Sequence, residues 1–324
     1  MTTQEVEKKS LELSVTPHVH SAHTTPKAMW YVNAALVPIV VASLIFFGIQ
    51  QIFVILVSVA FAVGTEIVIK TARKKPLTWK DGSAALTGLL LALVLPPDFS
   101  LVNTALGSIF AIAVGKELFG GLGYNIFNPA LVGRAFLQAA FPVPMTTWVK
   151  NNFNDTLTGA TPLSDFKFAE AGHKPAHDFL SMFYGNTMGS LGETSALLIL
   201  LAGIFLIIVG VVNWRIPLAM IIGVLVVGGL LYAMDMHKYP HPLFHLVGGG
   251  FMFAAVFMAT DWVTSPLTAK GMYLYGFLIS VIVVLIRVFG GLPEGVMYAI
   301  LIMNGFVPLI NRGFTPKIFG EVKK

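Results

Sequence analysis

A short polar run in the middle of the chain contains the residues whose types and spacing could carry covalent chemistry. It reads Asp155-Thr156-Leu157-Thr158-Gly159-Ala160-Thr161-Pro162. Proline disfavours helical backbone at the residue before it, so we expect the hydroxyl of Thr161 to point outward from an accessible loop. Such a hydroxyl could be esterified, but an Asx or ST turn is the structural alternative. The residues alone indicate an exposed threonine in a turn and leave its chemistry open.

A second set of candidates is polar or charged and lies within or beside long apolar segments. Charges at membrane depth are costly, so such residues pair with one another or line a pathway. For Glu66, Arg287 and Glu294 we favour a structural ion pair or a position at the membrane boundary. The candidates for an intramembrane flavin or ion pathway are Lys116, Glu117, Asn125, Asn128, Arg134 and Asp261.

Composition excludes several kinds of site. The 324 residues include no cysteine, which excludes disulfides, thiolate catalysis and cysteine-ligated iron–sulfur or zinc sites within this chain. We predict no catalytic residue and no metal site. The net charge of +5 is interpreted as a record of loop orientation in a membrane, because no basic-aromatic surface or nucleic-acid motif accompanies it.

The elements that must position these candidates are membrane-spanning helices. Hydrophobic residues make up 56% of the chain and charged residues only 11%, against about 25% charged in soluble domains. A spanning helix needs roughly 20 apolar residues. We expect about ten hydrophobic segments, some short or broken. They fall near residues 29–48, 51–69, 83–96, 101–119, 125–141, 194–212, 216–234, 244–261, 271–289 and 293–310.

Lysine and arginine are biased toward one side of this arrangement, most clearly in Arg73-Lys74-Lys75. The bias predicts cytoplasmic N- and C-termini. The predicted parts are an N-terminal tail (1–27), a first membrane repeat (28–141), an extracytoplasmic loop (142–192), a second repeat (193–311) and a C-terminal tail (312–324).

An internal similarity supports two halves. In the first half, Leu95-Pro96-Pro97 precedes Phe119-Gly120-Gly121. In the second half, Ser265-Pro266 precedes Phe289-Gly290-Gly291, and the two gaps are nearly equal. An odd number of spans per half would invert one half relative to the other, and inverted repeats with broken helices are typical of transporters. The predicted fold is an all-α integral membrane protein of about ten helices in two inverted five-helix repeats.

The polar run also resembles a known motif. Asp-x-x-(Ser/Thr)-Gly-Ala-Thr is similar to the acceptor motif for covalent flavin attachment, with Thr156 standing where glycine is frequent. Two longer segments, Asp81–Pro97 and Gly115–Gly133, resemble the family that includes the D subunit of the Rnf complex and the B subunit of the sodium-pumping NADH:quinone reductase. The resemblance covers residues 28–312 and implies a fold like that of urea transporters.

This resemblance implies cofactors and site residues. Thr161 would carry FMN through a phosphoester, donated from FAD by a separate flavin transferase with release of AMP. Asp155, Thr158, Gly159 and Ala160 would shape recognition by the transferase or contact the FMN. A non-covalent riboflavin, held in the membrane part of the B-type relative, is a second candidate cofactor. Asn125 and Asn128, which follow a glycine-rich break, could hydrogen-bond such a ligand.

The resemblance also implies a function. The chain would be a multi-pass subunit of a translocase-type oxidoreductase in a bacterial or archaeal cytoplasmic (inner) membrane, inactive alone. The complex would relay electrons between ferredoxin and NAD, coupled to Na⁺ or H⁺ translocation. Its partners would be the A, B, C, E and G types of Rnf subunit, with the FMN-bearing G type nearest. Two alternatives stay open: a B-type subunit of the quinone reductase, and a stand-alone urea-transporter-like channel.

Overall fold

The computed structural model describes residues 24–152, 155–168, 179–185, 187–193, 195–236 and 238–315. Most of the N-terminal tail predicted over 1–27, and the predicted C-terminal tail beyond residue 315, lie outside these ranges. The described chain is helical apart from one short hairpin.

Five helices of the described chain are long and apolar enough to cross a membrane. They are α1 (Thr25–Phe47), α2 (Gln51–Ala72), α10 (Arg215–Met234), α13 (Ala269–Phe289) and α14 (Val296–Gly313). Their outer faces carry large apolar side chains such as Ile45, Val68 and Leu230. Exposed apolar side chains on long helices are the surface that a lipid environment requires. The chain is therefore a membrane protein.

Other apolar segments form shorter or broken helices, as expected. They are α3 (Ser83–Leu93), α4 (Leu101–Ile112) with the π-helical η2 (Ala113–Glu117), α5 (Pro129–Ala140), α9 (Ala196–Ile208), α11 (Pro242–Val247), and α12 (Phe251–Phe253) with the π-helical η4 (Ala254–Met258). Pro96 and Pro97 follow the end of α3, where a missing N–H stops a helix. Gly249, with φ of 65°, separates α11 from α12.

The two Phe-Gly-Gly sequences occupy different kinds of element. Phe119 follows the π-helical η2, whereas Phe289 is the last residue of the long α13. The elements that correspond in order are η2 and η4. Each follows a short helix, and each precedes a helix whose first turn is capped by a side chain: Asn128 caps α5 and Thr268 caps α13. The pairing of motifs predicted from the sequence is therefore not a pairing of equivalent elements, because glycine is favoured wherever a helix ends.

Small residues allow the long helices to pack closely. A Cβ atom on Gly276 of α13 would lie 2.7 Å from the carbonyl oxygen of Ile216 on α10. A Cβ atom on Gly88 of α3 would lie 2.8 Å from the carbonyl oxygen of Ser58 on α2. Close backbone approach at small residues is characteristic of helix association in membranes.

The central segment is folded and contains the exception to the all-α prediction. β1 (Val149–Asn152) and β2 (Asp155–Thr158) pair antiparallel, with Val149 opposite Thr158. The hairpin was missed because its short polar run lacks the alternation that identifies a half-buried strand. The segment also contains α6 (Pro142–Thr146), α7 (Pro162–Phe168), α8 (Phe179–Tyr184) and η3 (Leu191–Glu193), while η1 (Trp79–Asp81) precedes α3.

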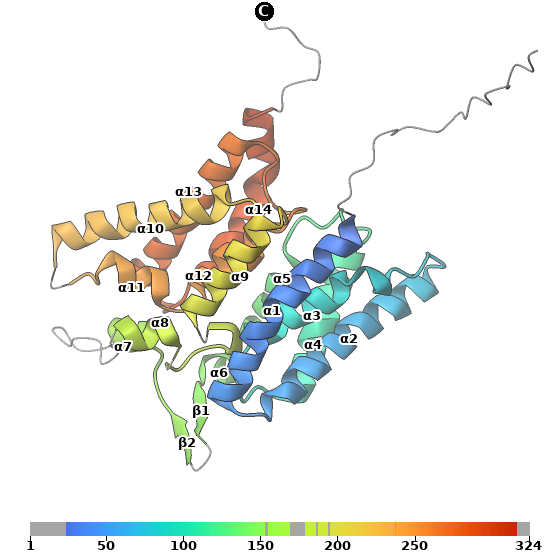
Figure 1. Ribbon diagram of the computed structural model, residues 1–324, viewed down its shortest axis with the longest axis horizontal. Coiled ribbons are helices and arrows are strands. Elements are labelled where there is room, and N and C mark those ends of the chain that lie inside the picture. The colour runs from blue at the N-terminus through green and yellow to red at the C-terminus, as the bar shows by residue number, and fades with distance from the viewer. Residues whose placement is uncertain are drawn as a thin grey trace, which may run out of the picture.

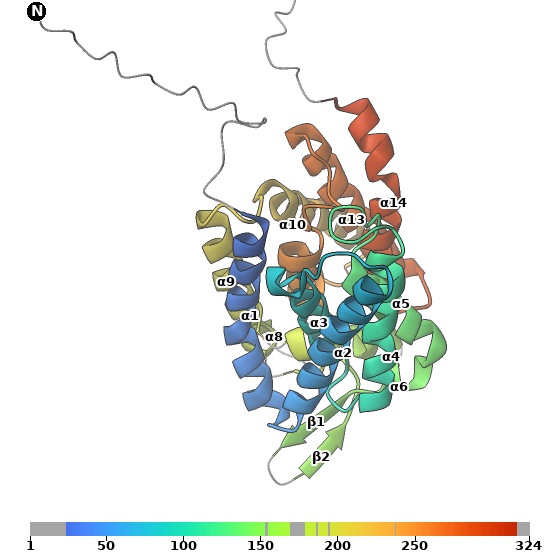
Figure 2. The same ribbon diagram turned by 90° about the vertical axis from the view of Figure 1, so that its right-hand side faces the viewer.

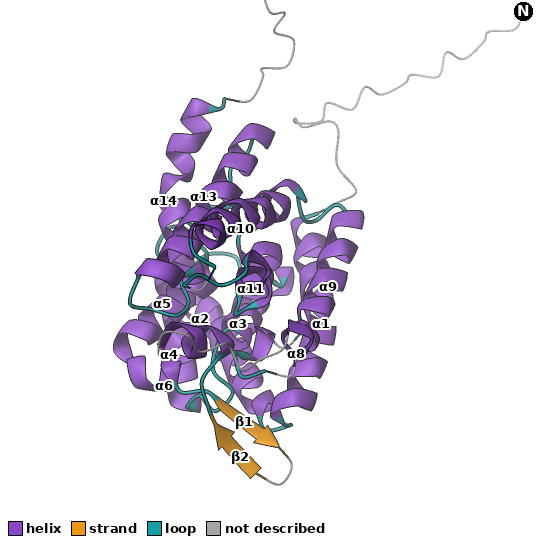
Figure 3. Cartoon of the chain, turned by 90° about the vertical axis from the view of Figure 1, so that its left-hand side faces the viewer, coloured by secondary structure: helices purple, strands orange, loops and turns teal. Residues whose placement is uncertain are grey.

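The hairpin and the ends of the described helical body lie at opposite ends of the molecule. The start of α1 and the end of α14 lie at the upper end in Figures 1 and 2, and β1 and β2 lie at the lower end. Figure 3 shows the hairpin, in orange, projecting below the helices. α1 and α9, the first helices of the two halves, pack against each other, so the halves share one helical body.

Candidate functional site

Thr161 lines a cavity of about 350 Å³ between the central segment and both halves of the helical body. We call it the Thr161 cavity. Its volume lies within the roughly 300–1,000 Å³ typical of small-molecule sites. Trp148, Phe168 and Tyr298 supply aromatic surface, and the other lining residues include Arg134, Gln138, Met145, Thr146, Met182, Thr187, Met188, Glu193, Gly249 and Glu294.

The hydroxyl of Thr161 faces inward, which corrects the outward orientation predicted from the sequence. The residue is only 9% exposed. Its Oγ1 accepts a hydrogen bond from the backbone N–H of Ser164 at 3.2 Å and lies 3.0 Å from Ser164 Oγ. Pro162 begins α7 instead of continuing a turn, so Thr161 takes the place where a hydroxyl caps a helix.

The other residues of the motif lie in β2 and between β2 and α7. Asp155 and Thr158 lie at the two ends of β2, and the backbone N–H of Gly159 donates to the carbonyl of Trp148 at 3.3 Å. A Cβ atom on Gly159 would lie 2.6 Å from Met188 Sδ. Gly159 therefore lies against Met188, which lines the cavity. Ala160 is exposed beside it.

Helix α7 is anchored to the second half. Lys167 Nζ donates to the carbonyl oxygens of Ile286, Arg287 and Leu292 at 3.2, 3.0 and 2.7 Å. Burial lowers the pKa of Lys167. Leu163 of α7 packs with Met182 and Phe244 in a small apolar cluster. These contacts fix the helix whose first turn contains the Thr161 hydroxyl.

One wall of the cavity is charged. Arg134 of α5 and Glu294 form an ion pair at 3.0 Å, and the backbone N–H of Gly250 donates to Glu294 Oε1 at 2.6 Å. Glu193 Oε2 accepts from the backbone N–H of Ser190 at 3.4 Å. Arg134 Nε and Glu193 Oε1 are buried without a hydrogen-bond partner in the described chain.

The two carboxylates of this wall differ in their surroundings. Glu294 has Arg134 and a backbone N–H as direct partners, whereas Glu193 has a single long hydrogen bond. Burial, with the negative charge of Glu294 nearby, raises the pKa of Glu193 to about 7. Glu193 is thus the carboxylate of the pair that can change its protonation near neutral pH.

The Thr161 cavity combines aromatic surface with buried polar atoms that lack partners in the described chain. Buried polar atoms without partners are costly, so they indicate an absent ligand or water. Here one guanidinium nitrogen, Arg134 Nε, and one carboxylate oxygen, Glu193 Oε1, lack partners in the described chain, beside aromatic side chains. This set suits a heteroaromatic ring that carries N–H donors and carbonyl acceptors together. The arrangement can bind and orient such a ring, and its ionisable wall can respond to charge placed on it.

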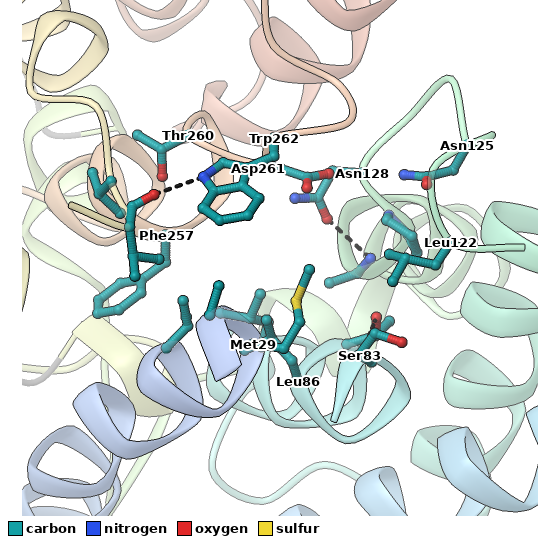
Figure 4. Close-up of a pocket in the computed structure, with 18 of the residues that line it drawn as sticks. Met29, Ser83, Leu86, Leu122, Asn125, Asn128, Phe257, Thr260, Asp261 and Trp262 are labelled. Atoms are coloured by element: carbon teal, nitrogen blue, oxygen red, sulfur yellow. Dashed lines mark hydrogen bonds between the residues drawn. The ribbon is translucent and has the colours of Figure 1, made fainter. Parts of the chain in front are cut away.

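The structure divides the predicted intramembrane residues between sites. Lys116, Asn125, Asn128 and Asp261 line a second, smaller cavity of about 80 Å³ between the halves. Figure 4 shows Asp261 with Thr260 and Trp262 on one side of it, Asn125 and Asn128 on another, and Met29 and Ser83 below. Arg134 lies instead at the Thr161 cavity, and Glu117 faces Lys70, with 3.9 Å between their charged groups.

The polar groups of this second cavity are mostly engaged. Asn128 accepts from the backbone N–H groups of Ala130 and Leu131 and donates to the carbonyl of Met258, so it caps α5. Asn125 Oδ1 is buried without a partner in the described residues. Of the two predicted amides, Asn125 therefore retains free capacity to bind a polar ligand.

Glu66 belongs to a buried charge cluster beside that cavity. Lys116 Nζ lies 2.9 Å from Glu66 Oε2 and donates to Ser83 Oγ at 2.6 Å, and Lys70 lies 3.0 Å from Glu66 Oε1. The structural ion pairs favoured for Glu66 and Glu294 are confirmed. Arg287 instead donates to the carbonyl oxygens of His245 and Gly248.

Sequence reasoning missed three contributors to the Thr161 cavity and its support: Glu193, Tyr298 and Lys167. Glu193 directly precedes an apolar segment, and a carboxylate at such a boundary is the one signal that could have identified it. Tyr298 reaches the cavity from α14, and Lys167 binds carbonyl groups more than a hundred residues away. Contacts between such distant segments leave no local pattern in the sequence.

Comparison with known proteins shows which family this chain resembles. A family model described as the NQR2, RnfD, RnfE family matches residues 12–320. The chain is 42% identical to the D component of the proton-translocating ferredoxin:NAD(+) oxidoreductase complex of Clostridium ljungdahlii, over 99% of each chain. It is 41% identical to the D component of the Na(+)-translocating ferredoxin:NAD(+) oxidoreductase complex of Acetobacterium woodii, over 97% of this chain and 96% of that one. The D component of an ion-translocating oxidoreductase complex of Stutzerimonas stutzeri is 38% identical over 91% of this chain and 92% of its own.

Proposed function

This chain belongs to the NQR2, RnfD, RnfE family, and on that premise we propose that it is the D-type membrane subunit of an ion-translocating ferredoxin:NAD oxidoreductase complex, with FMN esterified to Thr161. The complex couples electron transfer to translocation of Na⁺ or H⁺, which makes it a translocase-type enzyme that this subunit serves without being active alone. Its partners are the A, B, C, E and G types of subunit, with the G type nearest.

One observation carries the cofactor proposal: Thr161 lines a cavity whose volume, aromatic surface and unpaired polar atoms suit a flavin ring, and attachment would replace the contact of its hydroxyl with Ser164. Attachment forms a bond between Thr161 Oγ1 and the phosphorus of the FMN half of FAD. The bond between the two phosphate groups of FAD breaks, AMP leaves, and a base of the transferase takes the hydroxyl proton. Because Thr161 is buried, the acceptor segment must be displaced while the transferase acts.

The bound FMN supplies one- and two-electron transfer. The residues of this chain bind and orient it. The phosphoester at Thr161 fixes one end, and Lys167 holds α7 and hence the tether against the end of α13. Trp148, Phe168 and Tyr298, which line the cavity, would offer aromatic surface to the ring. A fixed ring position matters because electron transfer between cofactors depends on their separation.

We also propose that the helical body comprises about ten membrane segments in two inverted repeats, resembling urea transporters, with repeats over 28–141 and 193–311. The two π-helical segments in corresponding order support the repeat. The proposed orientation places both termini in the cytoplasm and the 142–192 loop outside, in a bacterial cytoplasmic membrane. The placement of β1 and β2 at the end opposite the start of α1 and the end of α14 supports it (Figure 1).

The smaller cavity is the place we propose for non-covalent riboflavin, next to the free Oδ1 of Asn125. Its volume of about 80 Å³ accommodates only a few waters, at roughly 30 Å³ each, so riboflavin binding requires the lining side chains to move apart. In an Asn125→Ala variant, the amount of flavin released by denaturation should decrease, while the amount of covalently attached flavin should be unchanged. Equal release from the variant and the wild type would reject this site.

The covalent proposal is tested by flavin fluorescence on a denaturing gel of the chain co-expressed with its transferase. We expect a fluorescent band for the wild type and none for Thr161→Ala. Thr146→Ala is the matched control, because Thr146 lines the same cavity, and it should keep the band. A band that persists in Thr161→Ala would move the attachment elsewhere, and a wild-type chain without flavin would reject the cofactor. Peptide mass mapping of residues 155–168 identifies the ester directly.

A further inference from the structure

Glu193 stands out among the residues of the Thr161 cavity because its carboxylate makes no salt bridge within the described chain, and Arg134 attracts it only at longer range. Arg134 is paired with Glu294 at 3.0 Å. The other nearby cation, Arg287, donates to the carbonyl oxygens of His245 and Gly248 at 2.6 and 2.9 Å. Both arginines therefore direct their hydrogen-bonded N–H groups to other partners and attract Glu193 only at longer range, while Arg134 Nε is left without a partner in the described chain.

The position of Glu193 is fixed by the backbone around it. The N–H of Leu191 donates to the carbonyl of Leu95 at 3.2 Å, at the break after α3. A Cβ atom on Gly192 would lie 2.9 Å from the carbonyl oxygen of Leu93, and one on Gly250 would lie 3.0 Å from Glu193 Oε1. The carboxylate is thus held against the broken helices of both halves and cannot easily turn away from the cavity.

A negative charge added to the cavity would act on Glu193 more than on Glu294. Glu294 remains ionised through Arg134 and the N–H of Gly250. Glu193 has an unpaired Oε1 and already faces one carboxylate, so a further negative charge favours its protonated form. Like charges in a low-dielectric site are relieved most readily by binding a proton.

We propose that Glu193 is the proton-binding group of the Thr161 cavity, taking up a proton when the cofactor there is reduced and releasing it when the cofactor is reoxidised. This inference rests on the proposed attachment of FMN to Thr161. One electron arrives from a one-electron carrier of a partner subunit, and one proton arrives from the aqueous phase on the loop side. The proton forms an O–H bond on Glu193, and reoxidation returns the electron to a partner carrier and the proton to water.

The test is a redox titration of the whole purified complex, followed by redox-difference infrared spectroscopy, in wild type and Glu193→Gln. Spectra of the Thr161→Ala complex are subtracted, so that only the flavin of this chain contributes. We expect a carboxylic acid C=O band to appear on reduction of the wild type and to be lost in Glu193→Gln. The pH dependence of the flavin midpoint potential should flatten around neutrality in the same variant.

Asp165→Asn is the matched control, since Asp165 lies on α7 close to Thr161 but does not line the cavity. It should keep both the band and the pH dependence. If Glu193→Gln does not assemble, Glu193→Asp retains a carboxyl group and should show the band at a changed frequency. A flavin-loaded Glu193→Gln complex with wild-type pH dependence and band would overturn the inference. Absence of gel fluorescence from the wild-type chain would instead reject the FMN proposal, whatever the behaviour of Glu193.

Discussion

The ammonium group of Lys167 on α7 donates a hydrogen bond to the carbonyl oxygen of Leu292, over a distance of 2.7 Å. Two further carbonyl oxygens at the end of α13 accept from the same nitrogen. A cation at a helix C-terminus is stabilised by the carbonyl groups that lack partners there. The side chain of Lys167 therefore attaches α7 to α13, a membrane-spanning helix of the second half.

Replacing Lys167 by methionine should loosen the acceptor segment. Hydrogen bonds to charged groups contribute about 1.5–3 kcal/mol each, so we expect faster proteolysis of the 142–192 loop and stronger quenching of the proposed flavin by iodide. Lys270→Met, at an exposed position in the first turn of α13, is the control. Equal proteolysis of the two variants would show that Lys167 is not an anchor.

Replacing Gly159 by alanine should reduce flavin attachment, and Met188→Ala should restore it. The added Cβ atom would lie 2.6 Å from Met188 Sδ and 2.8 Å from Met188 Cε, so either the end of the methionine side chain or the segment around Gly159 must shift. Removing the methionine side chain creates the missing space. Gel fluorescence per unit protein measures both effects. If the double variant stays as poorly loaded as Gly159→Ala, the glycine is required for recognition by the transferase and not for packing.

Lys116 and Glu66 should show strong energetic coupling. Their charged groups lie 2.9 Å apart with each side chain almost fully buried, and removing one partner of a buried pair typically costs about 3–5 kcal/mol. We expect Lys116→Met and Glu66→Gln each to lower the thermal midpoint of the detergent-solubilised chain, and the double variant to lose less than their sum. Additive losses would contradict the pairing, although Lys70 retains a contact with Glu66 in the first variant.

The protonation of Glu193 should make the flavin-free chain less stable as pH rises. Its pKa is raised from 4.5 to about 7 by burial beside Glu294, so between these values the folded state binds more protons than the unfolded state. Stability therefore falls with increasing pH across that window, by up to roughly 3 kcal/mol. Thermal unfolding of Thr161→Ala at several pH values measures this. The slope should decrease when Glu193→Gln is added, and an unchanged slope would assign it to another group.

Much of the membrane architecture could be predicted from the sequence because apolar length is a local property. The segments expected near 51–69 and 216–234 are the helices α2 (Gln51–Ala72) and α10 (Arg215–Met234). The π-helical η2 and η4 could not be predicted, since they differ from α-helix by one hydrogen-bond step within equally apolar sequence. The inverted repeat and its ten segments stay predictions.

The motif predicts Thr161 as the acceptor residue, but its surroundings could not be predicted. Thr161 was expected to face outward because Pro162 favours extended backbone at the residue before it, whereas Pro162 begins α7 and the Thr161 hydroxyl caps that helix. Arg134 was grouped with Lys116, yet the two line different cavities. Where helices are broken, residues that are close in the sequence can face different cavities. The sequence alone therefore does not determine which side chains meet.

The ion pair between Arg134 and Glu294 joins the first half of the body to the second, since α5 supplies one partner and the residues before α14 supply the other. A displacement of a few ångströms between the halves would separate the charges and leave each in a different field. The electrical environment of any group in the Thr161 cavity would then depend on how far apart the halves stand. The oxidation state of a cofactor in this cavity and the relative position of the two halves would then influence each other. Coupling of this kind is what an ion pump driven by electron transfer needs.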